Sequence, residues 1–150
     1  MQTGPHIRLV LWKTAKAIEQ VDRASISETG LVLSDFAIME VLLHKGPLPI
    51  NTIGDKVLLT SGSMTAAVNR LQRQGYVART KDHNDGRCFL IRLTGSGKRV
   101  IRQAFQRHAQ HLEQVADVLT DRERRELVRL LKKIGRNAER CMITPSGDGT

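Results

Sequence analysis

Apolar residues in the segment 59–75 recur with a helical period. Four of them stand at i, i+3, i+4 and i+7: Met64, Ala67, Val68 and Leu71. This spacing predicts a helix with one buried stripe. Thr60 or Ser61 can cap its first turn through a hydroxyl group, and Gly75 suits the position after its last turn.

The next segment changes to a period of two, which is typical of strands. Residues 76–80 and 88–93 are the predicted strands, and the polar segment 82–87 is the turn between them. Alternation places one set of side chains on a buried face: Phe89, Ile91 and Leu93. We interpret this helix as the recognition helix, here called the reading helix, and the hairpin as the wing of a winged helix-turn-helix.

Helical periodicity also covers most of the remaining chain. We predict a helix over 5–27, a nearly buried helix over 35–44 capped by Ser34, and a short helix carrying Ile50, Ile53 and Val57, with Gly54 and Asp55 on its other side. A long helix over 96–118, capped by Thr94, and a last helix from the capping box Thr120–Glu123 to Cys141 complete the chain. The predicted fold class is mainly α with a small β-hairpin wing.

The flanking helices carry more apolar surface than the winged unit can cover. We therefore interpret the chain, 1–150, as a reading unit at 34–93 with dimerisation helices at 5–27 and 96–141. A two-fold homodimer would bury their stripes, together with Trp12 beside the first stripe, in one interface. Such a dimer reads a pseudo-palindromic DNA site.

The outward face of the predicted reading helix is small and polar at its start and basic toward its end. Its side chains are Ser61, Ser63, Thr65, Asn69, Arg70 and Arg73. Short residues allow close approach to a DNA major groove, where asparagine and arginine can contact base edges or phosphates. An amphipathic helix with a solvated face is the ordinary alternative.

The hairpin adds a second candidate contact. Arg87 lies at its tip, and an arginine there is well shaped to enter a narrow minor groove. Asp85 lies two residues away, so we expect its carboxylate to orient the Arg87 guanidinium. Arg79, on the first strand, completes the predicted DNA-binding set.

Charge supports a polyanionic partner. The net charge is +9, and the excess lies in two segments. Residues 61–99 hold eight basic and two acidic residues, and residues 122–140 hold eight basic and three acidic residues. The rest of the chain is slightly negative, which points to double-stranded DNA as the partner of the reading unit. A basic helical module that binds an acidic protein is the alternative.

Several functional classes lack their sequence signals. The chain has no apolar run long enough for a membrane span, no secretory signal pattern, and two cysteines, which together predict a cytoplasmic protein. It has no phosphate-binding loop, zincin motif or nucleophile elbow, so we predict no catalytic residues and no cofactor. His108 and His111, with Glu113 nearby, are a weak metal signal, and we read them as a partly exposed pair.

At these motifs the sequence resembles the MarR family of winged-helix transcriptional regulators, over residues 7–141. The matching segments are 59–65, Arg70-Leu71, Gly75-Tyr76-Val77, Arg79, Asp85-x-Arg87 and Leu93-Thr94-x-x-Gly97. Segments 34–47 and 54–63 are most similar to the MhqR-like branch, whose members respond to quinones and related phenolics. The family commonly has an acid where Asn69 stands and arginine where Gly86 stands, so a helix-to-wing salt bridge would lack its acid here.

The resemblance implies a homodimeric repressor that a small effector releases from its operator. The family binds phenolic ligands between the dimerisation helices and the winged unit, where Trp12, Phe36 and Met39 could line a pocket or simply form core. A thiol sensor is the competing hypothesis, because Cys88 follows the wing arginine and lies near Arg79 and Arg92. A metal-responsive repressor of the same fold stays a further alternative. Cys141 is expected to be packed on the last helix's apolar stripe.

Overall fold

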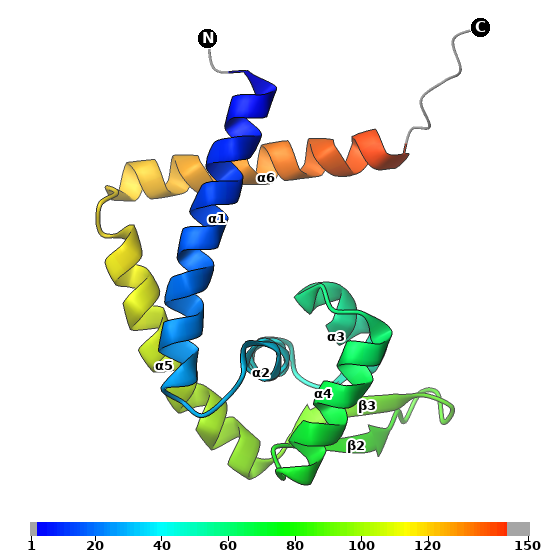
Figure 1. The fold of residues 1–150 in the computed structure, drawn as a ribbon. Coiled ribbons are helices and arrows are strands. Elements are labelled where there is room, and N and C mark those ends of the chain that lie inside the picture. Colours follow the sequence, from blue (N-terminus) through cyan, green and yellow to red (C-terminus); the bar gives the residue numbers. More distant parts are fainter. Residues whose placement is uncertain (1–2, 144–150) are drawn as a thin grey trace, which may run out of the picture. The chain divides into compact units, whose positions relative to one another are not determined.

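The computed structural model describes residues 3–143 and divides into two compact units, with the boundary between Leu112 and Glu113. Within the described residues there are six helices and three short strands (Figure 1). The helices are α1 Gly4–Ser27, α2 Leu33–Lys45, α3 Ile50–Val57, α4 Ser61–Arg73, α5 Gly95–Ala116 and α6 Asp121–Ile143. The strands are β1 Leu48–Pro49, β2 Val77–Lys81 and β3 Phe89–Leu93. This order confirms the predicted mainly helical class with a small β wing.

The sheet has one strand more than the predicted hairpin. β1 pairs with β3, and the strand order is β1-β3-β2 with antiparallel neighbours. A two-residue strand that contains a proline is too short to show alternation, which explains why the sequence pattern missed it. Phe89 was predicted to be buried but is 51% exposed, because β3 leaves the core toward the wing at that residue.

Most helix ends follow from local hydrogen bonding. The Gly97 N–H donates to the Thr94 hydroxyl oxygen at 3.0 Å, which confirms Thr94 as the cap of α5. α2 differs from its prediction, because it begins at Leu33 after Val32 and has no side-chain cap. Ser34 therefore lies inside the helix and does not cap it.

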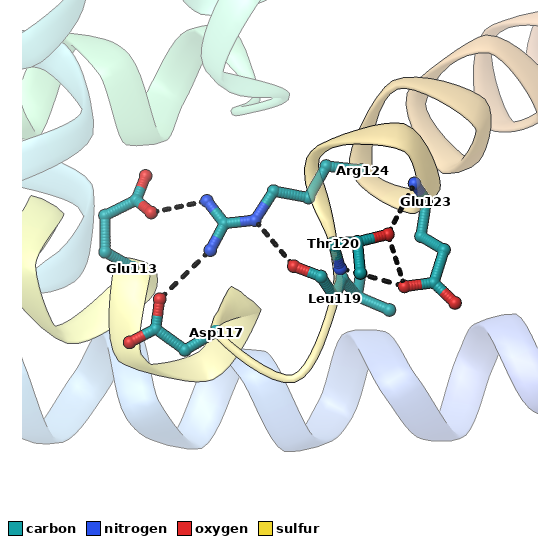
Figure 2. A network of polar contacts seen from close by, with 6 residues as sticks. All are labelled: Glu113, Asp117, Leu119, Thr120, Glu123 and Arg124. Atoms are coloured by element: carbon teal, nitrogen blue, oxygen red, sulfur yellow. Dashed lines mark hydrogen bonds and ion pairs between the residues drawn. The ribbon is translucent and has the colours of Figure 1, made fainter.

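The start of α6 is the predicted capping box (Figure 2). The Thr120 N–H donates to Glu123 Oε2 at 2.8 Å, and the Glu123 N–H donates to Thr120 Oγ1 at 3.4 Å. The bond from the Thr120 N–H also lowers the pKa of Glu123. Arg124 donates to Glu113 at 2.6 Å and to Asp117 at 3.1 Å, so it ties the end of α5 to the first turn of α6.

The core of the first unit lies among α2, α3, α4, α5 and the sheet. Its largest fully buried side chains include Phe36, Ile38, Met39, Ile53, Met64, Leu71, Ile91 and Ile101. Gly54 was predicted on the outer side of α3 but is buried against α4. A Cβ atom at Gly54 would lie 3.1 Å from Met64 Cγ, so glycine permits the close approach of these two helices.

Apolar residues remain exposed on the flanking helices of the single chain. On α1 they are Ile7, Leu9, Val10 and Trp12, with exposed fractions of 39–56%. On α6 they include Leu127, Leu130, Leu131 and Ile134, with exposed fractions of 40–46%. Cys141, predicted to be packed on the α6 stripe, is exposed as well.

Candidate nucleic-acid interface

α4 is built as the sequence predicts. The Thr60 hydroxyl oxygen accepts the Ser63 N–H at 3.3 Å, and the four residues of the predicted stripe are all buried. At the other end Gly75 adopts a φ of 77°, which glycine tolerates best. The N–H groups of Gly75 and Tyr76 donate to the carbonyls of Gln72 and Leu71, which is the Schellman ending of a helix.

The predicted polar face of α4 is open to solvent. Five of its six predicted DNA-contacting residues are exposed: Ser61, Ser63, Thr65, Asn69 and Arg73. The Thr65 hydroxyl donates to the Ser61 carbonyl at 3.0 Å, which holds this side chain close to the helix. The turn before α4 passes through Leu58, a left-handed residue with a φ of 57°.

Arg70, the sixth predicted contact, lies differently. Its guanidinium group turns toward α2, where Nε donates to Asp35 Oδ2 at 2.9 Å and Nη2 donates to Asp35 Oδ1. Asp35 is only 2% exposed. The structure therefore places Arg70 in an ion pair with a buried carboxylate instead of on the open face.

Sequence reasoning missed Asp35 as the partner of Arg70, although a signal was present. Asp35, Ile38, Met39 and Leu42 stand at i, i+3, i+4 and i+7, so Asp35 belongs to the buried stripe of α2. A carboxylate at such a position needs a hydrogen-bonding or charged partner.

Arg79 connects the wing to α4. Its Nη2 donates to Asn69 Oδ1 at 2.9 Å and its Nη1 donates to Gln72 Oε1 at 2.8 Å. The link that an acid at position 69 would make as a salt bridge is made here by two neutral amides. Because neither amide carries charge, the positive charge of Arg79 is not cancelled at this joint. Gln72 is a member of the site that the sequence pattern did not identify.

The wing turn is organised by its aspartates through the main chain. Asp85 Oδ1 accepts the backbone N–H of Arg87 at 3.0 Å, and Asp82 Oδ1 accepts the N–H of Asn84 at 2.9 Å. Asp85 was expected to hold the Arg87 guanidinium, but among residues 3–143 that guanidinium forms no ion pair with it. Asp85 thus shapes the turn, and the exposed Arg87 side chain extends from it.

Cys88 is exposed, as expected, but its electrostatic surroundings are the reverse of the prediction. Its thiol donates to Asp85 Oδ2 at 3.6 Å. The Asp85 carboxylate, by its charge and this hydrogen bond, raises the pKa of Cys88, and Asp82 adds to the effect. A raised pKa lowers the thiolate fraction at neutral pH, which disfavours the chemistry of a thiol sensor.

The three candidate pocket residues do not share one environment. Phe36 and Met39 are 2% and 0% exposed and belong to the core cluster, whereas Trp12 on α1 is 56% exposed. For Phe36 and Met39 the core interpretation therefore fits the structure.

His108 is buried, contrary to the prediction of a partly exposed pair. It is 6% exposed, its Nδ1 lies 3.0 Å from Ser25 Oγ, and its Nε2 lies 3.5 Å from Asp22 Oδ1. Its ring meets Phe36 edge to face, with 5.0 Å between the ring centroids. In the described part of the chain no group of three or more histidine, cysteine or acidic side chains could hold a metal ion.

Comparison with known proteins identifies the family. The sequence model of the MarR family matches residues 31–89. MhqR of Bacillus subtilis strain 168, an HTH-type transcriptional regulator, is 32% identical over 131 residues, which cover 87% of this chain and 90% of MhqR. The chain belongs to the MarR family. It is therefore a DNA-binding transcriptional regulator and not an enzyme, as the sequence predicted.

Solved structures agree with this membership. A MarR family protein from Bacillus stearothermophilus has the same fold, with a TM-score of 0.75, 24% identity, and coverage of 90% of this chain and 94% of that one. PcaV of Streptomyces coelicolor, solved with its natural ligand, gives a TM-score of 0.68 at 25% identity and covers 83% of this chain and 91% of PcaV. None of the helices in the described part of the chain is both long enough and apolar enough to span a membrane.

Proposed function

We propose that this MarR-family chain is a homodimeric repressor that binds a pseudo-palindromic operator in double-stranded DNA. The observation that carries the proposal is the open polar face of α4 joined to the wing by Arg79. α4 enters the major groove and the turn 82–87 enters the neighbouring minor groove. Two copies related by a two-fold axis place their α4 helices about one DNA turn, ~10 base pairs, apart.

Each exposed polar residue has a role in this arrangement. Ser61, Ser63 and Thr65 contact phosphates and orient the start of α4, and Asn69 and Arg73 reach base edges or the phosphates beside them. Arg79 holds the wing at a fixed position against α4 through Asn69 and Gln72. Its uncancelled charge also favours the approach of a phosphate group.

Arg87 is the minor-groove residue of the proposal. A narrow minor groove has an enhanced negative potential that attracts an inserted arginine. The Asp85 and Asp82 turns fix the backbone below this side chain, so less conformational entropy is lost when it binds.

The dimer is supported by the apolar residues left exposed on α1 and α6. A single copy exposes large aliphatic side chains and Trp12 on α1, and a further aliphatic stripe on α6. Exposed apolar stripes of this kind are typical of an interface between protein chains. A second copy of the same chain, related by a two-fold axis, is the partner that would cover each of these stripes.

The effector of the proposal is a small phenolic or quinone-like molecule. Two facts support a bound ligand over thiol oxidation: a relative, PcaV, was solved with a natural ligand, and the pKa of Cys88 is raised here. Ser25, His108 and Asp22 also bring hydrogen-bonding groups to a largely apolar region beside Phe36. A few polar groups among apolar ones are what a phenolic ligand requires.

The test of the function is a fluorescence anisotropy titration with DNA from the region upstream of the protein's own gene. It is run near physiological salt with an excess of random duplex, because specific binding survives such competition. Nanomolar binding is expected, and salicylate or a benzoquinone should release the DNA. Binding that random duplex removes completely would contradict a sequence-specific regulator, and DNA retained in the presence of both compounds would contradict the effector class.

The Arg87→Ala variant tests the wing. We expect the operator affinity to fall by about 1–3 kcal/mol, as for one lost specific contact, while the fold and the mass of the dimer are unchanged. Arg125→Ala, at an exposed arginine of α6, is the matched control and should bind as the unmodified protein does. Equal affinities of both variants would refute the placement of Arg87 in the minor groove.

A further inference from the structure

The ion pair between Asp35 and Arg70 joins two helices of the first unit. Asp35 belongs to α2 and Arg70 to α4, the helix proposed to read DNA. Nε and Nη2 of Arg70 donate to the two different oxygens of the Asp35 carboxylate. This bidentate geometry fixes the orientation of the Arg70 side chain as well as its distance from Asp35, because the guanidinium and carboxylate planes must align.

The two partners differ in exposure, and the difference decides how the pair acts. The Asp35 side chain is 3% exposed, whereas the Arg70 side chain is 39% exposed. The buried carboxylate therefore depends on the guanidinium for the charge and the hydrogen bonds that water would otherwise supply. Arg70, in turn, must keep its guanidinium on the α2 side of α4 to satisfy Asp35.

This constraint sets the orientation of α4. Successive helix residues point about 100° apart, at 3.6 residues per turn, so fixing one side chain fixes the directions of all the others. Asn69 directly precedes Arg70 and Arg73 lies three residues after it, and both are on the open face. Any roll of α4 that moved Arg70 off Asp35 would also turn Asn69 and Arg73 away from their positions.

α2 is itself held firmly on its other side. Phe36, the residue after Asp35, is 2% exposed and contacts the His108 ring of α5 edge to face. The pair thus anchors α4 to an element that is already packed into the core. A buried ion pair contributes little net stability relative to a well-packed apolar pair, but it can select one geometry among several.

We propose that Asp35 and Arg70 are positioning residues for DNA reading: their ion pair fixes the roll of α4 so that Asn69 and Arg73 face the bases. The inference rests on the proposed function of α4. It assigns Arg70 no direct contact with DNA, although the sequence pattern placed Arg70 on the outward polar face of the predicted helix and predicted such a contact. It makes Asp35, which touches no DNA, a determinant of specificity.

A double-mutant cycle tests the proposal. The variants are Asp35→Asn, Arg70→Gln and the double variant, and each is titrated with operator DNA and with random duplex. Each single variant should lose roughly tenfold or more in operator affinity, about the value of one well-made base contact, and little in random-duplex affinity. The double variant should be no weaker than the weaker single variant, because both substitutions break the same interaction.

Salt dependence separates positioning from direct contact. The double variant keeps the net charge of the protein, so its slope of log affinity against log salt should equal that of the unmodified protein. A phosphate contact by Arg70 would instead reduce that slope by about 1. Arg73→Gln, on the open face of the same helix, is the control and should weaken binding to both kinds of DNA.

Two further variants keep the test valid if a substitution harms folding. Asp35→Glu retains the charge but moves it by one methylene group, and Arg70→Lys retains the charge but not the bidentate geometry. Both should unfold close to the temperature of the unmodified protein and still lose operator affinity. Full operator affinity in the Asp35 variants, with Arg70→Gln weakened on both DNAs, would overturn the proposal and make Arg70 a direct contact. Failure of the unmodified protein to bind any operator would instead refute the proposed function.

Discussion

At the scale of single residues, the partner of a side chain matters more than its type. Arg70 and Arg79 are both arginines beside the proposed reading surface, yet one neutralises a buried carboxylate and the other contacts two neutral amides. Only the second keeps its charge uncancelled near the expected path of the DNA. The sequence showed where these arginines stand along the chain, but not which acceptor each one would meet.

Cys88 gives a residue-scale prediction about reactivity. In a Cys141→Ser background, Asp85→Asn should increase the rate of iodoacetamide alkylation near pH 7.5 several-fold. The reason is that the Asp85 carboxylate is the largest cause of the raised pKa of Cys88, so removing it lowers this pKa and increases the thiolate fraction. The amide oxygen of asparagine can still accept the Arg87 N–H, which preserves the turn.

Asp82→Asn is the matched control for this measurement. Asp82 is the smallest of the causes that raise the pKa of Cys88, so its removal should increase the alkylation rate less. Equal rates in the unmodified and the Asp85→Asn background would show that Asp85 does not control this thiol.

At the scale of elements, the helices with the longest hydrophobic periodicity were the ones whose starts could be predicted from the sequence. α1, α4, α5 and α6 carry stripes over many residues, and each begins within a residue of its predicted start. The Thr94 cap and the Thr120–Glu123 capping box could be predicted from the sequence, because their hydrogen bonds join residues only three positions apart. The strand β1 and the burial of Gly54 depend on contacts with distant segments, which a single sequence does not display.

Gly97 allows a prediction at this scale. It stands in the first turns of α5, where a Cβ atom would lie 2.0 Å from the Tyr76 carbonyl oxygen. That oxygen already accepts the Thr94 N–H at 3.0 Å, so the residue before β2 and the residue before α5 are held close together. Gly97→Ala should therefore lower the free energy of unfolding by about 1–3 kcal/mol, as overpacking usually does. Urea unfolding followed by circular dichroism measures it.

Gly95 in the same helix provides the comparison. A Cβ atom at Gly95 would meet only Arg99 Nη1, at an ordinary 3.7 Å. Gly95→Ala should be neutral or slightly stabilising, because alanine is the better helix former. If both variants unfolded at the same urea concentration, the close approach at Gly97 would not limit the packing of α5.

At the scale of the whole molecule, the exposed apolar residues and the charge distribution both support the proposed DNA-binding homodimer. The basic excess in residues 61–99 belongs to the reading unit, while α1 and α6 carry the uncovered apolar stripes. In the proposed dimer, this organisation would separate the DNA-contacting surface from the self-association surface. The basic excess and the apolar stripes could both be predicted from the sequence, the first from composition and the second from helical periodicity, because neither depends on contacts between distant segments.

The proposed dimer can be tested with the only tryptophan of the chain, Trp12. Its side chain is 56% exposed in the single chain, so burial in an interface should shift its emission to shorter wavelength. Dilution should reverse the shift at the concentration where sedimentation equilibrium shows the mass falling from dimer to monomer. Emission that stays constant while the mass falls from dimer to monomer would place Trp12 outside the interface.

The α6 stripe gives the matching substitution. Leu131 is 40% exposed in the single chain, so an interface can bury only that part of the side chain, which contributes about 1 kcal/mol of the roughly 1.5–3 kcal/mol for a fully exposed leucine. Two-fold symmetry counts the loss twice, so Leu131→Gln should raise the dimer dissociation constant roughly tenfold or more. Met142→Gln, at a side chain 87% exposed near the end of α6, should change it little. Operator affinity should fall with Leu131→Gln alone, because a monomer contacts one half-site; an unchanged mass and affinity would remove α6 from the proposed interface.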